Sequence, residues 1–331
     1  MRVLVTGGAG YIGSHTVANL ISHGHEVTVL DDLSRGHQGA LQHFPSAVLE
    51  VGPVADERRV SEILSNRKID AVIHFAASSL VGESTADPLL YYRNNVAGTQ
   101  SLLGAMVESG VTSLIFSSSA AVYGEPATVP IDEASPIRPT NPYGETKAAI
   151  ERMLYWVHQA HGLNSVSLRY FNAAGAHPDW PIGEDHQPET HLIPCVLKAA
   201  LEGRPVSVFG IDYPTPDGTA VRDYIHVVDL AEAHRLALEW LFMHPGAHAF
   251  NLGNGQGFSI REVIQTAQTV VGREIATIES ARRRGDPAVL KASVNKARAD
   301  LGWSPQWSDL TTILQTAWNW HCRHPHGYGN G

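Results

Sequence analysis

The sequence predicts an α/β fold, a doubly wound parallel sheet with a smaller C-terminal region. Short, nearly unbroken apolar runs alternate with helical patterns through the first half of the chain, as expected of strands buried on both faces. A glycine-rich turn joins the first of these runs to the first helical pattern. After Asn172 long stretches rich in Pro, Gly and acidic residues replace the alternation, and such loops usually surround a site.

The expected elements follow in chain order. Strands are predicted at Val3–Thr6, Glu26–Leu30, Ala47–Val51, Ala71–Phe75, Ser113–Ser117 and Ser165–Tyr170. Helical patterns lie between them, and the one from Gly10 to His23 aligns Ile12, Thr16 and Leu20 on one face. Regular alternation of strand and helix predicts parallel pairing. We expect a first domain at 1–170, with a return of the chain around 223–240, and a second domain at 171–331.

Composition excludes several classes of protein. The chain has 331 residues, 43% hydrophobic and 17% charged, which is ordinary for a globular protein. Its net charge of −9 argues against a polyanion-binding surface, so no nucleic-acid partner is expected. The apolar runs are shorter than the roughly 20 residues of a membrane span, so no membrane partner is expected either. Two cysteines, Cys195 and Cys322, and no visible export signal favour the cytoplasm.

The glycine-rich turn indicates a dinucleotide. Gly7, Gly10 and Gly13 would let the backbone approach a pyrophosphate, whose charge is met by free N–H groups at the start of the helix. The second strand ends near Asp31, whose carboxylate would bind ribose hydroxyls and repel a 2′-phosphate. The alternative is a purely structural turn, but its position between strand and helix favours a cofactor site. NAD is therefore predicted rather than NADP.

Three polar residues indicate proton transfer. Tyr143 and Lys147 are one helical turn apart, which places the phenol and the ammonium on one face. Lys147 and a positive nicotinamide would stabilise the phenolate, so Tyr143 is predicted to act as a general base. Ser119 follows the fifth strand, where it would bind a sugar hydroxyl and exchange its proton with Tyr143. A tyrosine and a lysine at this spacing alone would more often be a surface pair.

A family resemblance rests on these residues and on further motifs at Gly7–His15, Val81–Ser84, Asn94–Val96, Arg169–Asn172, Asp217–Thr219 and Val221–Val227. They resemble the extended short-chain dehydrogenase/reductases (SDR) and, more narrowly, the UDP-glucose 4-epimerases, from Met1 to about Tyr328. The resemblance implies a Rossmann-type NAD-binding domain, a UDP-sugar-binding domain and a role in galactose metabolism. It also implies reversible epimerisation of UDP-glucose and UDP-galactose through a transient 4-keto-sugar, with Tyr143 as the base.

Site residues follow from the motifs and the resemblance. Those expected to hold the cofactor are Gly7, Gly10, Tyr11, Ile12, Gly13, Asp31, Asp32, Phe75, Ala76, Ala77, Asn94, Ser117, Tyr143, Lys147 and Tyr170. Those expected to hold the UDP-sugar are Ser119, Tyr143, Phe171, Asn172, His191, Leu192, Ser207, Phe209, Arg222, Tyr224, Arg283, Asp286 and Leu290. The family's pairing implies a homodimer through the helices around Pro88–Ser109 and Pro142–His161.

Related activities remain as alternatives. Ala120 and Ala121 stand where sugar-nucleotide dehydratases carry an acid pair, so elimination of water has no evident catalyst. Leu290 stands where a tyrosine or a smaller residue gates the sugar pocket, which leaves room for UDP-GlcNAc and UDP-GalNAc as substrates. A UDP-pentose 4-epimerase is a further alternative. A non-catalytic NAD-sensing regulator is disfavoured because it needs no Tyr143, Lys147 and Ser119 together.

Two positions near the expected cofactor site differ from the family pattern, and one segment near the C-terminus is rich in histidine. Pro53 stands where relatives carry an acid that contacts adenine, and Ser79 where many carry a lysine, so weaker NAD binding is expected. The segment from His321 to His326 lacks the paired spacing of a zinc site, so no metal is predicted.

Overall fold

The computed structural model describes residues 1–283 and 286–329. Its largest feature is a seven-stranded sheet in the order β11-β6-β5-β4-β1-β2-β3, with every neighbouring pair parallel. The strands are β1 (Arg2–Thr6), β2 (Glu26–Asp31), β3 (Val48–Val51), β4 (Ala71–His74), β5 (Ser113–Ser117), β6 (Asn164–Tyr170) and β11 (Ala247–Leu252). The six predicted strands are present and differ from their expected bounds by a single residue at most. The doubly wound fold class is confirmed.

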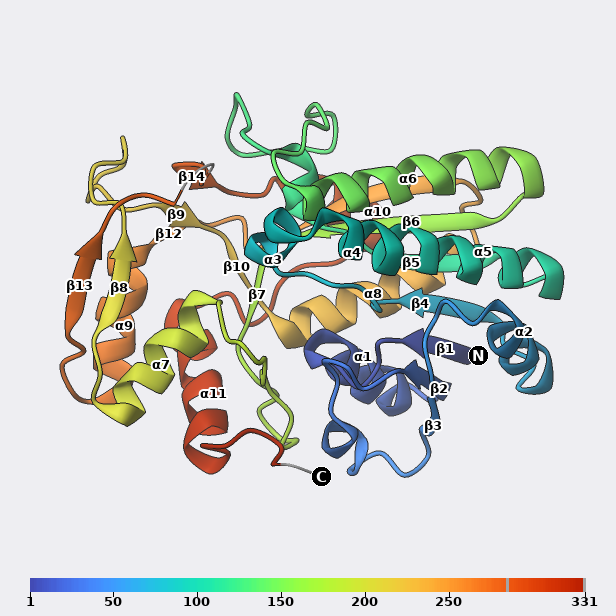
Figure 1. The fold of residues 1–331 in the computed structure, drawn as a ribbon, viewed down its shortest axis with the longest axis horizontal. Coiled ribbons are helices and arrows are strands. Elements are labelled where there is room, and N and C mark those ends of the chain that lie inside the picture. The colour runs from blue at the N-terminus through green and yellow to red at the C-terminus, as the bar shows by residue number, and fades with distance from the viewer. Residues whose placement is uncertain (284–285, 330–331) are drawn as a thin grey trace.

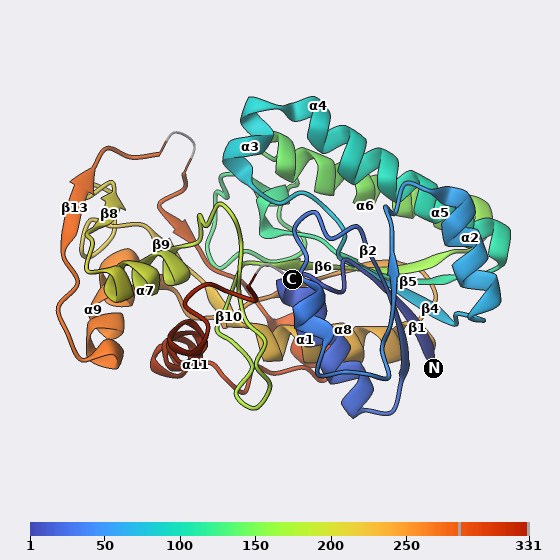
Figure 2. The ribbon, with the colours of Figure 1, turned by 60° about the horizontal axis from the view of Figure 1, so that its bottom comes forward.

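Helices cover both faces of this sheet (Figure 2). One face is covered by α1 (Tyr11–Ser22) and α8 (Val227–Leu241). The other is covered by α2 (Glu57–Asn66), α5 (Gly98–Ser109) and α6 (Pro142–His161). Shorter elements connect them: η1 (Gln38–Leu41), α3 (Val81–Ala86), α4 (Pro88–Tyr91), the π-helical η2 (Tyr92–Ala97) and η3 (Ala120–Tyr123).

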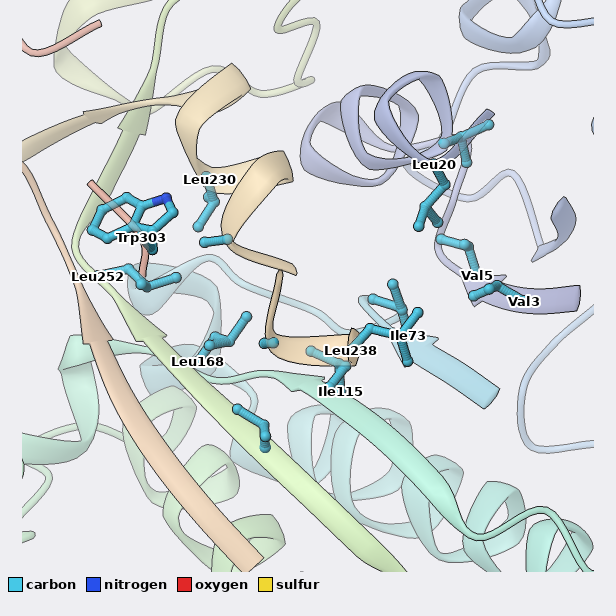
Figure 3. Close-up of a cluster of buried hydrophobic side chains, with 14 of the residues drawn as sticks. Val3, Val5, Leu20, Ile73, Ile115, Leu168, Leu230, Leu238, Leu252 and Trp303 are labelled. Atoms are coloured by element: carbon cyan, nitrogen blue, oxygen red, sulfur yellow. The ribbon is translucent and has the colours of Figure 1, made fainter. Parts of the chain in front are cut away.

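The core explains why the strands are almost continuously apolar. Val3 and Val5 point towards α1 and α8, where they join Leu20, Leu230 and Leu238 in one cluster (Figure 3). The intervening residue of β1 points the other way, into a second cluster beneath α2, α5 and α6 that contains Leu4, Val72, Leu114, Phe116, Ile150 and Leu154. Because successive side chains alternate between faces, both faces of β1 must be apolar.

The chain returns to this sheet late in the sequence. β11 pairs in parallel with β6 from Ala247 to Leu252, and α8 packs beside α1. The sequence did not predict β11, because this edge strand mixes His248 and Asn251 with short apolar residues and lacks the apolar run of an inner strand.

A smaller part lies beside the sheet, at the left of Figure 1. Its helices are α7 (Leu192–Glu202), α9 (Ile260–Val271) and α11 (Leu310–Arg323), whereas α10 (Asn295–Leu301) packs against α8 and β11 of the large sheet. The short strands of the smaller part are β7 (Asn172–Ala174), β8 (Val206–Phe209), β9 (Val221–Arg222), β10 (Tyr224–His226), β12 (Phe258–Ser259), β13 (Thr277–Ser280) and β14 (Val289–Leu290). Val196, Val263 and Ile313 contribute to a separate apolar cluster here. None of the helices within the described ranges combines the length and the apolar character needed to cross a bilayer.

Candidate active site

A cavity of about 1300 Å³ lies at the carboxyl ends of the strands, between the sheet and the smaller part. Every residue that the sequence predicts for the cofactor or the substrate lines this cavity. β1 and β4 are neighbours at its floor, where the strand order changes direction, and open parallel sheets bind ligands at such a switch point.

The glycine loop after β1 is packed so closely that side chains do not fit. A Cβ on Gly7 would lie 2.7 Å from the backbone nitrogen of Ala76, and the φ of Gly7 is +71°. A Cβ on Gly13 would lie 2.1 Å from the carbonyl oxygen of Gly7. These two glycines therefore keep the loop, the start of α1 and the end of β4 in contact. The result is a backbone cradle at a helix N-terminus, as a pyrophosphate requires.

Asp31 is held in place by the same loop. Its Oδ2 accepts a hydrogen bond from the backbone N–H of Ala9 at 3.0 Å, and its Oδ1 accepts one from Leu33 at 2.9 Å. Burial raises the pKa of this carboxyl, and the two backbone donors oppose the rise. The cradle and the oriented Asp31 both fit the phosphates and ribose of NAD.

Tyr143 and Lys147 lie on the first two turns of α6. Asn141 caps this helix by accepting a hydrogen bond from the N–H of Gly144 at 2.9 Å, and Pro142 occupies its first position. Lys147 Nζ lies 5.8 Å from the centre of the Tyr143 ring and donates to the carbonyl oxygen of Ser117 at 2.7 Å. Tyr143 and Ser119 line the same cavity, and the Ser119 side chain acts on the pKa of the phenol. The three residues predicted for proton transfer are therefore brought together.

Burial acts on the ionisable groups of both Tyr143 and Lys147. It raises the pKa of Tyr143, and the Ser119 side chain lowers it in part. It lowers the pKa of Lys147 to about 7, and the charge of Glu151 opposes this change. Desolvation disfavours the charged form of each group. Because the phenolate and the ammonium have opposite charges, they stabilise each other when both are present.

A buried ion pair behind these residues was not predicted. Glu151, one turn beyond Lys147, forms a salt bridge with Arg169 at 2.6 Å and accepts a hydrogen bond from Ser118 Oγ at 2.6 Å. Arg169 also donates to the hydroxyl of Tyr123 at 2.8 Å. This network ties the end of β5 to α6 and β6, and so positions Ser119 and Lys147. A charged residue, Arg169, within a strand that was expected to be buried was the available signal for it.

Asn94 lies on the π-helical η2, an irregularity that often marks a functional site. Its Nδ2 donates to Ser78 Oγ at 2.9 Å, while the neighbouring Asn95 accepts from the N–H of Ser78 at 2.8 Å. Ser78 follows β4, so η2 holds this part of the cofactor side of the cavity.

Two arginines that were predicted to hold the substrate lie on the substrate side of the cavity. Arg222 is buried and forms an ion pair with Asp286, another residue predicted for the substrate. The guanidinium of Arg283 lies over the ring of Phe209, 4.1 Å from its centre. Both arginines line the cavity and offer the planar donors that suit phosphate oxygens.

Comparisons with known proteins agree with this geometry. Residues 3–253 match the family described as "NAD dependent epimerase/dehydratase family". A curated UDP-glucose 4-epimerase from Halalkalibacterium halodurans is 54% identical over 329 residues, covering 99% of this chain and 98% of the relative.

Two solved structures are also similar. The UDP-glucose 4-epimerase of Brucella ovis in complex with NAD has a TM-score of 0.93 at 48% identity and covers 99% of this chain and 98% of its own. That of Bifidobacterium longum in complex with NAD⁺ and UDP has a TM-score of 0.93 at 40% identity and covers 99% and 100%. The chain belongs to the NAD-dependent epimerase/dehydratase family.

Proposed function

We propose that this chain is an NAD-dependent UDP-glucose 4-epimerase, an isomerase that interconverts UDP-glucose and UDP-galactose. The observation that carries the proposal is the convergence, in one cavity, of the glycine loop, the Tyr143–Lys147–Ser119 group and the two arginines. The full-length relative named for this activity supports it.

Bound NAD supplies a nicotinamide that accepts a hydride from the sugar and later returns it. The chain's own residues manage the proton and the position of the sugar. Tyr143 takes the proton of the 4-hydroxyl as general base, and returns it when the 4-keto-sugar is reduced on its other face. Ser119 binds the same hydroxyl. Lys147, fixed on the Ser117 carbonyl, stabilises the phenolate, whose pKa is otherwise raised by burial.

The nucleotide end of the substrate needs a firm hold, because the sugar must turn over between its oxidation to the 4-keto-sugar and the reduction of that keto-sugar. Arg222 and Arg283 are proposed to bind the diphosphate, with Arg222 leaving its ion pair with Asp286 when the phosphates arrive. Binding energy at this remote end keeps the keto-sugar in the cavity while its ring reorients.

The side chain at position 290 favours a second activity on acetamido sugars. Leu290 lines the cavity and packs against the cluster formed by Ala120, Tyr123 and Ile131. Its side chain is shorter than tyrosine and has no hydroxyl, so we propose that UDP-GlcNAc and UDP-GalNAc also enter. Epimerisation of a UDP-pentose by the same site is the remaining alternative.

One assay tests these activities. UDP-galactose, UDP-GalNAc and UDP-arabinose are incubated separately with the protein, and NMR identifies the products. Formation of UDP-glucose supports the main proposal, whereas its absence with NAD-loaded protein would contradict it. Turnover of UDP-GalNAc decides the second activity.

NAD affinity is a separate proposal. Pro53 lines the cavity without a carboxylate or an N–H, and Ser79 lines it without a charge. We propose that NAD is held less tightly than in relatives with an acid and a lysine there. Purified protein that keeps its full complement of NAD through extensive dialysis would count against this.

We also propose a homodimer, a cytoplasmic location and the division into an NAD-binding unit (1–170, with the return around 223–240) and a UDP-sugar-binding unit (171–331). Large apolar side chains are exposed on the helices expected to pair, among them Leu89, Tyr155 and Trp156. Both cysteines are free, as is usual in a reducing compartment.

A further inference from the structure

The loop that leads into α7 brings two glutamates and two histidines together at one wall of the cavity. Glu184 Oε1 lies 2.9 Å from His186 Nδ1 and 2.7 Å from His191 Nδ1. Glu189 Oε1 lies 3.1 Å from the same His191 nitrogen. One ligand atom from each of the four side chains lies within 4.8 Å of all the others. No step of the proposed epimerisation uses this convergence.

The chemistry of the cluster matches a divalent cation. Glu184 and Glu189 raise the pKa of His191 to about 10, so a cation would take the place of the proton that His191 holds between them. Once that proton is released, two carboxylates and two imidazoles carry a charge of −2, which one divalent ion balances. The side chains of Glu184 and Glu189 are only 6% and 8% exposed, so water does little to stabilise their charges. Buried charges are normally paired or bound to a metal.

Glu189 provides an independent observation. Its Oε1 accepts hydrogen bonds from the N–H groups of Thr190 and His191, at 2.8 and 2.9 Å. Its Oε2 is buried and has no hydrogen-bond partner among the residues that the structure describes. A buried carboxylate oxygen without a partner is costly, and a cation within the cluster would satisfy it.

We propose that Glu184, His186, Glu189 and His191 bind one divalent transition-metal ion, with Zn²⁺ as the best match. Two imidazole nitrogens select Zn²⁺ over Mg²⁺ and Ca²⁺, which prefer ligand sets made of oxygen. Ligand atoms about 2.0–2.2 Å from a tetrahedral Zn²⁺ lie about 3.3–3.6 Å from one another. In this cluster three pairs of ligand atoms are 2.7–3.1 Å apart and every pair is within 4.8 Å, so small movements of the side chains would bring them to that spacing.

The ion has a structural role in this proposal. His191 immediately precedes α7, and the ring of His186 lies edge-on to that of Tyr11 at the start of α1, 6.2 Å between centres. The ion therefore fixes the loop between the cofactor-binding helix and the wall of the sugar pocket. The sequence did not indicate this site, because the four ligands lie in a loop and match no familiar zinc spacing.

Metal content tests the proposal without reference to activity. Untagged protein is stripped with a chelator, saturated with Zn²⁺, desalted and analysed by mass spectrometry for metal per chain. We expect one ion per chain in the wild type. His186→Gln and Glu189→Gln should each weaken Zn²⁺ binding by about 100-fold or more, because each removes a ligand. His326→Gln, in the exposed histidine-rich segment near the C-terminus, is the matched control and should keep one ion.

A second measurement guards against misfolded variants. Circular dichroism must show the wild-type helix content, and Co²⁺ should give the visible absorption of a tetrahedral site in the wild type and His326→Gln only. A wild-type protein that retains no Zn²⁺ would overturn the proposal. So would wild-type metal content in both His186→Gln and Glu189→Gln, since the ion would then lie elsewhere.

Discussion

Tyr143 and Lys147 share one buried end of α6, and burial moves their proton affinities in opposite directions. The pKa of the phenol is raised and that of the ammonium is lowered to about 7, because desolvation disfavours the charged form of each group. Each residue alone is therefore a poor ion in this environment. Proton transfer at neutral pH depends on the pair together with the positive charge of bound cofactor.

Replacing Tyr143 with Phe tests the general base. The variant keeps the ring in its buried place but removes the atom that carries the proton, so kcat should fall by about 10²–10⁴-fold or more. The thermal midpoint should change by only a few degrees. Steady-state epimerisation and thermal unfolding measure the two effects. Tyr155→Phe, on the exposed side of the same helix, is the control, and turnover unchanged in Tyr143→Phe would refute the assignment.

The lowered pKa of Lys147 predicts a pH-dependent stability. Between pH about 7 and about 10.4 the unfolded chain keeps a proton on this lysine that the native protein has lost. Stability of the NAD-free protein therefore rises with pH across this window, by up to about 1.4 kcal/mol per pH unit from this group. Below pH 7 both states carry the proton, and the full cost of the buried charge is present.

Lys147→Met isolates this contribution, because methionine fills similar space without a charge. From pH 7.5 to pH 9 the free energy of unfolding of the wild type should rise by about 2 kcal/mol relative to that of the variant, as measured by denaturant unfolding. Other titrating groups cancel in this difference. A stability gap that is the same at both pH values would show that Lys147 is not deprotonated in the free protein.

At the scale of elements, the junction of β1 and α1 depends on the absence of side chains. A Cβ on Gly13 would clash with the backbone carbonyl oxygen of Gly7. Neither atom can move out of the way by a side-chain rotation, because the backbone fixes the position of each. Gly13→Ala should therefore displace the loop from the start of α1. We expect NAD affinity to fall by at least about tenfold, and stability by about 1–3 kcal/mol.

A control separates the cradle from ordinary glycine effects. Gly110 ends α5 with a φ of +71° and open space around it. Gly110→Ala should cost about 1 kcal/mol of stability and leave NAD affinity unchanged. Isothermal titration with NAD and thermal unfolding supply both readouts. Equal NAD affinity in Gly13→Ala and wild type would mean that this loop does not hold the cofactor.

We expect the proposed dimer to form through the outer face of α4, α5 and α6. Trp156 is 67% exposed on α6, near the exposed Tyr155. Trp156→Glu should convert the proposed dimer into a monomer, because a charge would be buried at the interface. Light scattering measures the mass. Met243→Glu, on an exposed apolar residue after α8, should not change it. A monomeric wild type would end the proposal.

For the whole molecule, local patterns predicted the sheet well. Val3–Val5 and Ile73 are apolar because both faces of their strands are covered, and that property is visible in the sequence. The Gly7 and Asp31 motifs and Ser119 lie at the carboxyl ends of β1, β2 and β5, so parallel pairing alone gathers them at one edge, and Tyr143 joins them from the start of α6. These parts of the fold and the candidate site needed only local information.

What the sequence did not indicate depends on contacts between distant segments. Arg169 is conspicuous as a charged residue in a buried strand, but its partner Glu151 cannot be identified until β6 and α6 are placed side by side. β11 has no apolar run because it lies at the edge of the sheet. The ion pair of Arg222 with Asp286 likewise joins two separate segments of the smaller part, because Arg222 lies in β9 and Asp286 lies shortly before β14. Spacing along the chain carries no information about such pairs.

The C-terminal segment ties such distant parts together, and Tyr328 carries the last prediction. Its hydroxyl accepts a hydrogen bond from the N–H of Gly183 at 3.0 Å, and its ring stacks on His37, 5.2 Å between centres. Tyr328→Phe keeps the ring but leaves the Gly183 N–H without that acceptor, at a cost of about 1–3 kcal/mol. We expect the thermal midpoint to fall by about 2–4 °C in thermal unfolding. Tyr155→Phe should leave it unchanged, and an equal midpoint in Tyr328→Phe and wild type would show that this segment contributes little to the stability of the whole molecule.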